Sequence, residues 1–265
     1  AKGVSSPGEE EKRWEEEENR QLLEGAEARH YRELVARANY LAQDRVDIQF
    51  ATKEVCRGMC NPCKGDLKKL RRLARYLITV PRMVMKYEWQ LEGHRMLGHT
   101  DSDFAGCRTT AKSTSGGVIS MGTHYLKSWS STQKTIALSS GEAELTAVVK
   151  CSCECIGMVQ LAEDWGLTIE ADVLVDSTAA LGVVNRKGAG RLRHVRVGKL
   201  WIQQVQEDGD LRYRKVKGTQ NPADMITKYL ASSEVNKYLE ILGIDTRTGR
   251  ADSSLEITLC VQGTS

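Results

Sequence analysis

The sequence predicts an α/β protein in which helices cover a mixed sheet and a helical segment comes first. Residues 27–79 carry apolar side chains at three- and four-residue steps, which is typical of amphipathic helices. Residues 95–131 contain short strand-like runs broken by glycine, and helical and strand-like patterns alternate after residue 140. Strands in a meander, followed by alternating helices and strands, indicate a mixed sheet with helices on its faces.

The helical segment contains two clear periodic stretches. Residues 31–43, YRELVARANYLAQ, and residues 66–78, DLKKLRRLARYLI, each place their apolar side chains on one face. The opposite face of the second stretch is basic and could be ordinary solvated surface or a contact with phosphates. Its cations are Lys68, Lys69, Arg71, Arg72 and Arg75.

The remaining elements follow Pro81. The expected strands are residues 82–89, 95–101, two strands within 113–131 around the turn Met121-Gly122-Thr123, 171–176 and 210–218. The expected helices are residues 140–165, 177–188, 194–206 and one that opens at 221–230. We therefore divide the chain into an acidic segment at 1–26 (disordered or an exposed helix), a helical segment at 27–90, an α/β domain at 91–242 and a flexible tail at 243–265.

Charge is distributed unevenly, although the formal net charge is only +3. Residues 9–18 hold seven Glu against one Lys and one Arg, whereas residues 186–218 hold ten Lys and Arg against three acidic residues, a local charge of +7. Such a concentration indicates a polyanionic partner or a solvated basic surface. We find no signal peptide and no run of 18 apolar residues, so we expect an intracellular protein without a membrane partner. The chain begins with Ala, so we expect a fragment of a longer polyprotein.

The eight cysteines are expected to be reduced thiols. Cys56, Cys60 and Cys63 form one cluster, but no fourth Cys or His lies nearby to complete a tetrahedral zinc site. The other cluster, CSCEC at 151–155, lies in a helical pattern that scatters its thiols around the helix.

Two glutamates near residue 140 have different expected roles. Ser139 and Glu142 form an S-x-x-E capping box, which gives Glu142 a structural role at a helix N-terminus. Glu144 is rotated by about 200° from Glu142 and shares its face with Val148 and Cys151. A carboxylate at the edge of a buried face is costly to desolvate without a compensating partner such as a cation.

Three aspartates have both a structural and a functional interpretation. Asp101 ends a predicted strand and could be a turn residue, like Asp103 beside it. Asp176 could cap the helix at 177–188, and Asp224 could compensate a helix dipole after Asn221. Together with Glu144, however, the carboxylates of Asp101, Asp176 and Asp224 are what two divalent cations about 4 Å apart require.

Several segments, in order, resemble the ribonuclease H domain of copia-type (Ty1/copia) retrotransposon Pol polyproteins. They are GHTDSDFAG, KSTSGGVISMG, LKSWSSTQKTIALSSGEAELTAV, VLVDSTAAL and NPADMITKYL, which fall within about residues 95–242. Residues 31–88 are similar to the helical end of the reverse transcriptase of those elements. The resemblance implies a ribonuclease H-like mixed five-stranded sheet flanked by helices.

The resemblance also implies an activity and its residues. It implies endonucleolytic hydrolysis of the RNA strand of an RNA–DNA hybrid with two Mg²⁺ or Mn²⁺ ions, held by Asp101, Glu144, Asp176 and Asp224. The implied partners are the hybrid and the reverse transcriptase portion of the parent polyprotein. We expect Asp103 to be a supporting or turn residue. The residues expected to contact nucleic acid are Ser113, Arg186, Lys187, Arg191, Arg193, His194, Arg196, Lys199 and Lys217.

Two departures from the family pattern bear on function. Many ribonucleases H carry a His in the loop before the last Asp, but here that loop is VKGTQNPAD. His194 could substitute for it, contact phosphate, or be a surface residue at a helix start. The paired-aspartate polymerase motif is absent, so we expect no polymerase activity from this chain. The alternatives are a catalytically inactive or domesticated nucleic-acid-binding remnant and, less well matched, an integrase or resolvase with the same fold.

Overall fold

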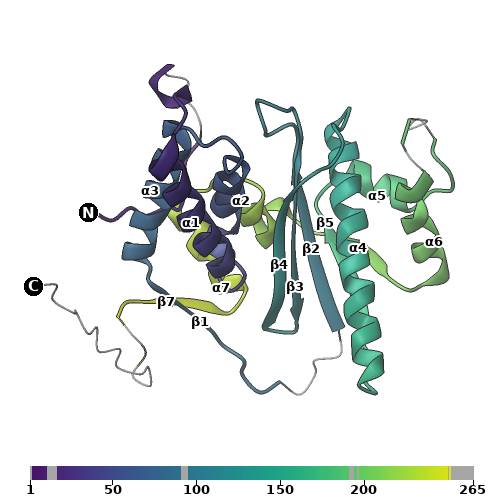
Figure 1. Cartoon of the computed structure of the whole chain (residues 1–265). Helices are drawn as coiled ribbons and strands as arrows, with labels where there is room; N and C mark the ends of the chain where they lie inside the picture. Colours follow the sequence, from purple (N-terminus) through teal and green to yellow (C-terminus); the bar gives the residue numbers. More distant parts are fainter. Residues whose placement is uncertain are drawn as a thin grey trace, which may run out of the picture.

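The structure is a computed structural model that describes residues 2–10, 17–90, 95–190, 194–195, 197–249 and 251. The predicted class is confirmed as far as the architecture goes: a mixed five-stranded sheet is flanked by helices and preceded by a helical segment (Figure 1). The domain limits proposed from the sequence stay a prediction.

In the described part of the chain, the helical segment extends over residues 17–79 and contains three α-helices and two short 3₁₀ helices. They are η2 (Glu17–Arg20), α1 (Gly25–Leu41), η3 (Val46–Ile48), α2 (Gln49–Arg57) and α3 (Lys64–Thr79). The apolar faces of α1, α2 and α3 meet in a core around Tyr31, Val35 and Leu73, all of which are buried. This segment also contains a buried, bidentate ion pair, in which Arg45 Nε and Nη2 donate to the two Asp47 carboxylate oxygens at 2.9 and 2.7 Å.

The sheet has the strand order β4-β3-β2-β5-β6. Its strands are β2 (Arg95–Asp103), β3 (Thr114–Met121), β4 (His124–Thr132), β5 (Glu170–Val175) and β6 (Arg212–Lys215). β2, β3 and β4 pair antiparallel, whereas β5 runs parallel to both β2 and β6. The predicted turn between β3 and β4 is present, with Gly122 at a positive φ of 59° that suits a tight hairpin.

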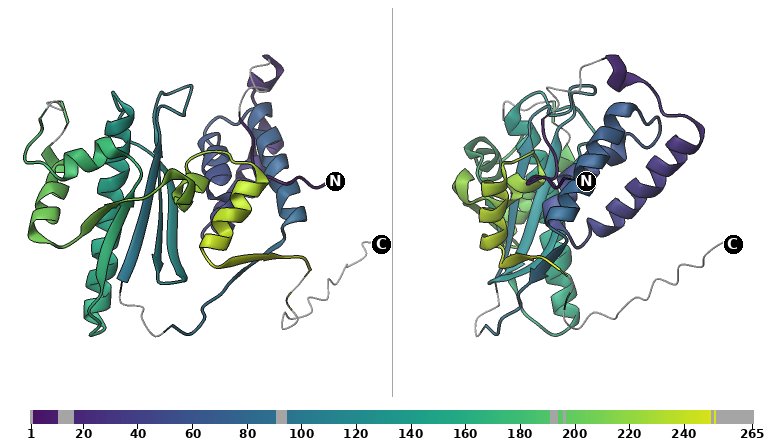
Figure 2. Two further views of the ribbon diagram at one scale, coloured as in Figure 1. Left: turned by 180° about the vertical axis from the view of Figure 1, so that it is seen from behind. Right: turned by 90° about the vertical axis from the view of Figure 1, so that its left-hand side faces the viewer.

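Helices cover both faces of the sheet (Figures 1 and 2). On one face lie α4 (Ser140–Asp164), α5 (Thr178–Val184), η4 (Val197–Lys199) and α6 (Trp201–Asp208). The other face is covered by η6 (Pro222–Ile226) and α7 (Ser232–Ile241), next to the helical segment, and η5 (Gly218–Gln220) precedes η6. Helix α4 is long and apolar enough to cross a membrane by length and composition, but it packs along β2, β3 and β5 as the core helix of a sheet.

Two segments differ from the sequence prediction. The helix expected at 221–230 is a short 3₁₀ helix, η6, and the α-helix begins only at Ser232. The tail expected from residue 243 begins with strand β7 (Ile244–Arg247), which pairs antiparallel with β1 (Arg82–Met85). Backbone pairing with a strand more than 150 residues earlier leaves no local signal, which is why the sequence pattern did not indicate β7.

A close approach between α4 and β2 gives the first prediction. A Cβ atom on Gly98 of β2 would lie 2.6 and 2.8 Å from the buried thiols of Cys155 and Cys151. We expect Gly98→Ala to lower the free energy of unfolding by about 1–3 kcal/mol, because the helix or the thiols must shift. The control is Gly157→Ala on the exposed side of α4, where a Cβ meets nothing within 4 Å and should stabilise the helix by about 0.5–1 kcal/mol. Urea unfolding measures both, and a Gly98→Ala protein as stable as wild type would contradict this packing.

Candidate active site

The register of the parallel strands brings two of the predicted carboxylates together. Thr100 on β2 lies opposite Val175 on β5, so the residues that follow, Asp101 and Asp176, lie at the same carboxyl-terminal edge. Asp176 was considered as a helix cap in the sequence, but Ser177 is the N-cap of α5 and its Oγ accepts the Ala180 N–H at 3.2 Å. The Asp176 carboxylate therefore has no capping role.

Glu144 comes to this edge from the second turn of α4. One oxygen from each of Asp101, Glu144 and Asp176 lies within 4.8 Å of the other two. The capping role expected for Glu142 is present in modified form: Ser139 Oγ accepts the Glu142 N–H at 3.2 Å, and Glu142 Oε2 accepts the Leu138 N–H at 2.9 Å. The two glutamates thus serve separate purposes.

Asp224 reaches the same edge from η6. Asn221 caps η6 by accepting the Ala223 N–H, and its amide donates to the Thr100 carbonyl at 2.9 Å, directly beside Asp101. After burial, the negative charge of Asp101 is the main cause of the raised pKa of Asp224, which indicates that the two carboxyl groups are close neighbours. Asp224 is not one of the three mutually close oxygens. All four predicted carboxylates lie at one edge of the sheet.

Burial and mutual repulsion act on these groups. Burial, and then the charges of Asp101 and Asp176, raise the pKa of Glu144 to about 9. Burial, followed by Asp101, raises the pKa of Asp224 to about 6, and burial is also the main cause of the raised pKa values of Asp101 and Asp176. Lys228 Nζ lies 3.0 Å from Asp224 Oδ1 and offsets part of this negative charge.

The donor set fits a hard divalent cation. Glu144 Oε2 is buried without a hydrogen-bond partner, which is costly for a carboxylate oxygen. Carboxylate oxygens are the ligands that Mg²⁺ and Mn²⁺ prefer, and a cation at this edge would lower the pKa of every carboxyl group around it. Asp101, Glu144 and Asp176 are the residues best placed to hold such an ion, with Asp224 beside them.

Three neighbours of the carboxylates were not recognised in the sequence. Thr227 donates a hydrogen bond to Asp101 Oδ2, and Asn221 connects η6 to β2 as described above. Gly116 on β3 lies against η6, since a Cβ there would be 2.6 Å from Thr227 Cγ2 and 3.2 Å from the Ala223 carbonyl. The paired glycines of STSGG were a possible signal for this close approach.

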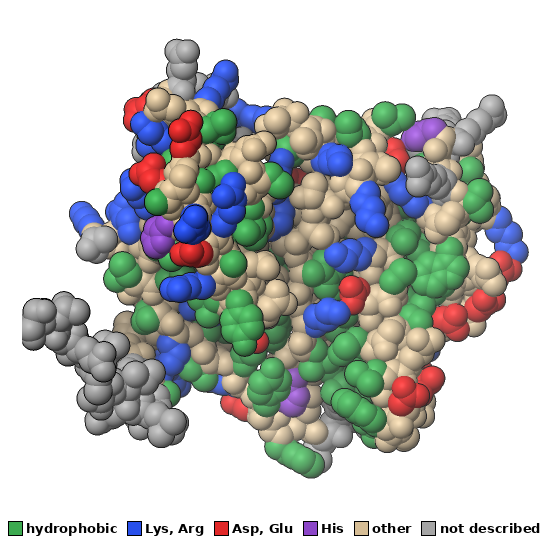
Figure 3. Space-filling view, viewed as in Figure 1, with side chains coloured by type: hydrophobic (Ala, Val, Ile, Leu, Met, Phe, Trp, Pro, Cys, Tyr) green, Lys and Arg blue, Asp and Glu red, His purple; other side chains and the backbone are tan. Residues whose placement is uncertain are grey.

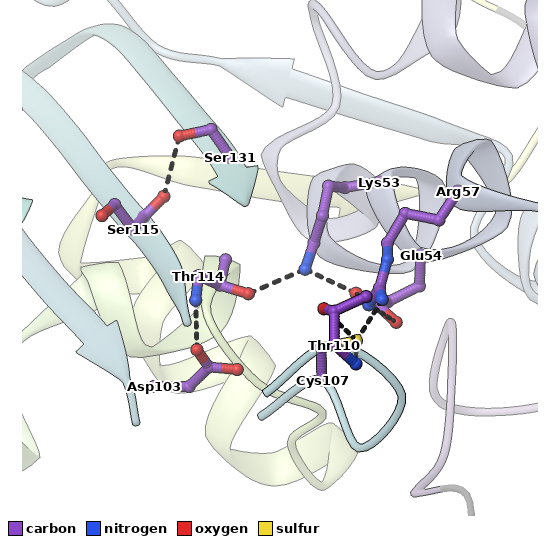
Figure 4. A network of polar contacts seen from close by, with 9 residues as sticks. All are labelled: Lys53, Glu54, Arg57, Asp103, Cys107, Thr110, Thr114, Ser115 and Ser131. Carbon is purple, nitrogen blue, oxygen red and sulfur yellow. Dashed lines mark hydrogen bonds and ion pairs between the residues drawn. The ribbon is translucent and has the colours of Figure 1, made fainter. Parts of the chain in front are cut away.

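The helical segment contacts the end of the strand that carries Asp101 (Figure 4). β2 continues through Asp103, so this residue is part of the strand and not a turn, and its carboxylate accepts the Thr114 N–H of β3. Lys53 of α2 donates to Thr114 Oγ1 at 2.8 Å, and Arg57 of α2 donates to the Cys107 sulfur in the following loop. Helix α2 thus contacts both the strand that pairs with Asp103 and the loop that follows it.

The residues expected to contact nucleic acid lie in different environments. Ser113 is fully buried and accepts the Ala105 N–H, so a direct contact with nucleic acid does not fit this position. His194 lies 3.1 Å and Lys199 3.3 Å from the Glu142 carboxylate, beside the start of α4. Lys187 and Lys217 are exposed, and Arg186 is half-buried. Arg191, Arg193 and Arg196 lie outside the described residues.

The raised pKa values give a pH prediction for the metal-free protein. Because Glu144 and Asp224 bind protons more tightly in the folded than in the unfolded state, their contribution to stability is complete at acidic pH and is lost as the pH rises through about 6 and about 9. In EDTA, we expect the Tm of wild type to fall between pH 5 and pH 9 by about 4 °C or more relative to Glu144→Gln, which cannot ionise.

Scanning calorimetry of both proteins across this pH range measures the difference. Mg²⁺ at pH 8 should raise the Tm of wild type more than that of Glu144→Gln. A Tm difference that does not change with pH would show that the Glu144 carboxyl titrates normally.

Comparison with known proteins relates the chain to mobile elements. No family model matches it. It is 29% identical over 220 residues to the retrovirus-related Pol polyprotein from transposon RE1 of Arabidopsis thaliana, and 29% identical over 202 residues to that from transposon TNT 1-94 of Nicotiana tabacum. These matches cover 81% and 76% of the chain, and the chain spans about 15% of the length of each relative.

Some of the solved structures that match this chain are ribonucleases H, with low overall similarity to it. LC11-RNase H1 in complex with an RNA/DNA hybrid is 17% identical with a TM-score of 0.35, covering 54% of this chain and 99% of that one. The protease–reverse transcriptase of prototype foamy virus gives 19% identity and a TM-score of 0.29, covering 50% of this chain and 18% of that one. The sequence matches, which extend over about four fifths of the chain, relate it to retrovirus-related Pol polyproteins of plant transposons.

Proposed function

We propose that the chain hydrolyses the RNA strand of RNA–DNA hybrids, as an internal endonuclease within a retrotransposon reverse-transcription polyprotein. The observation that carries the proposal is the group of three acidic oxygens, from Asp101, Glu144 and Asp176, within 4.8 Å of one another at the sheet edge. Structural carboxylates are normally paired with cations or hydrogen-bond donors, but Glu144 Oε2 has neither. A divalent cation would be a suitable partner for this oxygen.

The chemistry assigned to these residues is the positioning of metal ions. Bound divalent cations supply an activated water and stabilise the leaving oxygen of a phosphodiester. The chain's part is to hold four carboxylates on β2, α4, η6 and the end of β5, where packed backbone elements fix their positions. The Asn221 amide donates to the Thr100 carbonyl, and the Thr227 hydroxyl donates to the Asp101 carboxylate. These two hydrogen bonds hold η6 and the residue after it against the end of β2.

The substrate class rests on homology and on charge. Relatives of this chain are Pol polyproteins of transposons, whose reverse transcription produces RNA–DNA hybrids. On the face shown in Figure 3, Lys and Arg side chains extend from the helical segment across the middle of the molecule. Such a surface suits a phosphate backbone and implies binding that weakens steeply with salt. Contacts to the 2′-hydroxyl would select RNA over DNA.

Cleavage of a labelled hybrid in Mg²⁺ tests the proposal. We expect Asp176→Asn to lower kcat/KM by roughly a hundredfold or more, because the neutral amide is a poorer ligand for a divalent cation. The fold should survive, since Asp176 lies past the end of β5 and Ser177 caps α5. Single-stranded RNA and duplex DNA of the same sequence should remain intact.

Glu142→Gln is the matched control, because it neutralises a carboxylate two residues from Glu144 while keeping an oxygen that can accept the Leu138 N–H. We expect its kcat/KM to stay within a few-fold of wild type. If wild type cleaves no faster than Asp176→Asn, the enzymatic proposal fails. Retained hybrid affinity in both proteins would then favour a nucleic-acid-binding remnant.

A further inference from the structure

The N-terminal residues 2–10, named here the N-terminal strap, contact the C-terminal half of α3 through Arg72, Arg75 and Thr79. In the ribbon view the strap lies beside the helical segment (Figure 2). The carbonyl of Lys2 accepts a hydrogen bond from Arg75 Nε at 2.6 Å. Gly3 lies so close to Thr79 that a Cβ atom there would overlap with the threonine hydroxyl. The first part of the strap is therefore in contact with the last turn of α3.

The acidic part of the strap neutralises the centre of this face. Arg72 Nη1 lies 2.9 Å from Glu9 Oε2, and Arg72 Nη2 donates to Ser6 Oγ at 2.9 Å. Further toward the start of α3, Lys68 donates to Asn19 Oδ1 at 2.7 Å. Three cations of the basic face thus already have anionic or polar partners supplied by residues 2–19.

The strap continues from α3 to the candidate active site. A Cβ atom on Gly8 would overlap with the ring of Tyr229, which follows Lys228, the partner of Asp224. Beyond Gly8, Glu10 lines an open groove of about 850 Å³ between the helical segment and the sheet. Thr227, the hydrogen-bond partner of Asp101, lines the same groove. The strap therefore spans from the basic face of α3 to the neighbourhood of the catalytic carboxylates.

The groove itself has evenly matched charges. Among the described residues, its walls carry four cations, Arg57, Lys69, Arg108 and Lys228, and four carboxylates, of which Glu10 comes from the strap and the others are Glu54, Asp66 and Asp103. Withdrawal of Glu9 and Glu10 would release Arg72 and leave the groove with an excess of positive charge. An anionic chain that replaced the strap would therefore meet a basic path from α3 to Thr227.

We infer that the basic face of α3 is a docking surface for the phosphate backbone of the hybrid, and that the N-terminal strap is an intramolecular competitor for it. Glu9 and Ser6 occupy Arg72 as a phosphate would, with two oxygens on one guanidinium. This inference rests on the proposed function in that the competing polyanion is taken to be the hybrid. It adds a second contact region and a means of restricting access to it.

The experiment compares hybrid affinity after removal of two negative charges from the strap. Glu9→Gln with Glu10→Gln is matched by Glu163→Gln with Asp164→Asn, which removes the same charge from the exposed end of α4. Both pairs are placed in the full chain carrying Asp176→Asn, so that a fluorescent hybrid of about 20 base pairs is not cleaved during anisotropy titration.

We expect the strap variant to bind the hybrid about three- to tenfold more tightly than the control at about 50 mM salt, with a smaller gain at about 200 mM. Adding Arg72→Gln to the strap variant should remove most of the gain. Equal affinities of strap variant and control would overturn the inference, as would an Arg72→Gln substitution without effect in the strap variant.

Hydrogen exchange provides a second readout that needs no substitution in the strap. Saturating hybrid should increase exchange of the backbone amides of residues 2–10 in the Asp176→Asn protein, because the strap is displaced. Unchanged or slower exchange there would contradict competition. Cleavage by wild type is measured separately, so an active enzyme with an inert strap disproves this inference and leaves the proposed function intact. Strap-dependent binding without any cleavage would support this inference and disprove the proposed function.

Discussion

The arrangement of this protein depends on holding four carboxylates together at one partly buried edge of a sheet. Like charges this close repel, and burial makes each harder to ionise, so the pKa of Glu144 rises to about 9. Packing elsewhere must hold the groups in place against this repulsion. Apolar contacts of α4 and α5 with β2 and β5 do so on one face, and the Asn221–Thr100 hydrogen bond fixes η6 on the other.

The helical segment is built onto the same edge. Helix α2 reaches the Asp103 end of β2 through Lys53 and Arg57. The strap that contacts α3 reaches Tyr229, which follows η6 in the chain. Other contacts between the two regions lie elsewhere, such as the hydrogen bond between Gln49 and Ser128 of β4 and the pairing of β1 with β7. A change in the helical segment, or in what binds it, has a short physical route to the candidate active site.

Local patterns in the sequence predicted much of this arrangement, and their failures have specific causes. The 3.6-residue spacing of α1 and α3 and the S-x-x-E box at Ser139 act over a single turn, so they could be read directly. Asp176 and Ser177 are both good N-caps, and only the backbone geometry selects Ser177. Ser113 was expected to contact nucleic acid, but its side chain is buried and its hydroxyl accepts the Ala105 N–H, a tertiary arrangement that the local sequence does not reveal.

By itself, the sequence determined the α/β class and the order of most elements, and it predicted a set of four acidic residues, three of which form the mutually close group. These follow from side-chain period, turn chemistry and a family motif. The tertiary structure decided that β7 pairs with β1, that η6 packs against Gly116, and that the strap lies along α3. It also separated Asp101, whose oxygen joins Glu144 and Asp176, from Asp103, which binds the Thr114 amide. These outcomes depend on contacts between residues far apart in the chain, and no local pattern encodes which distant surfaces will meet.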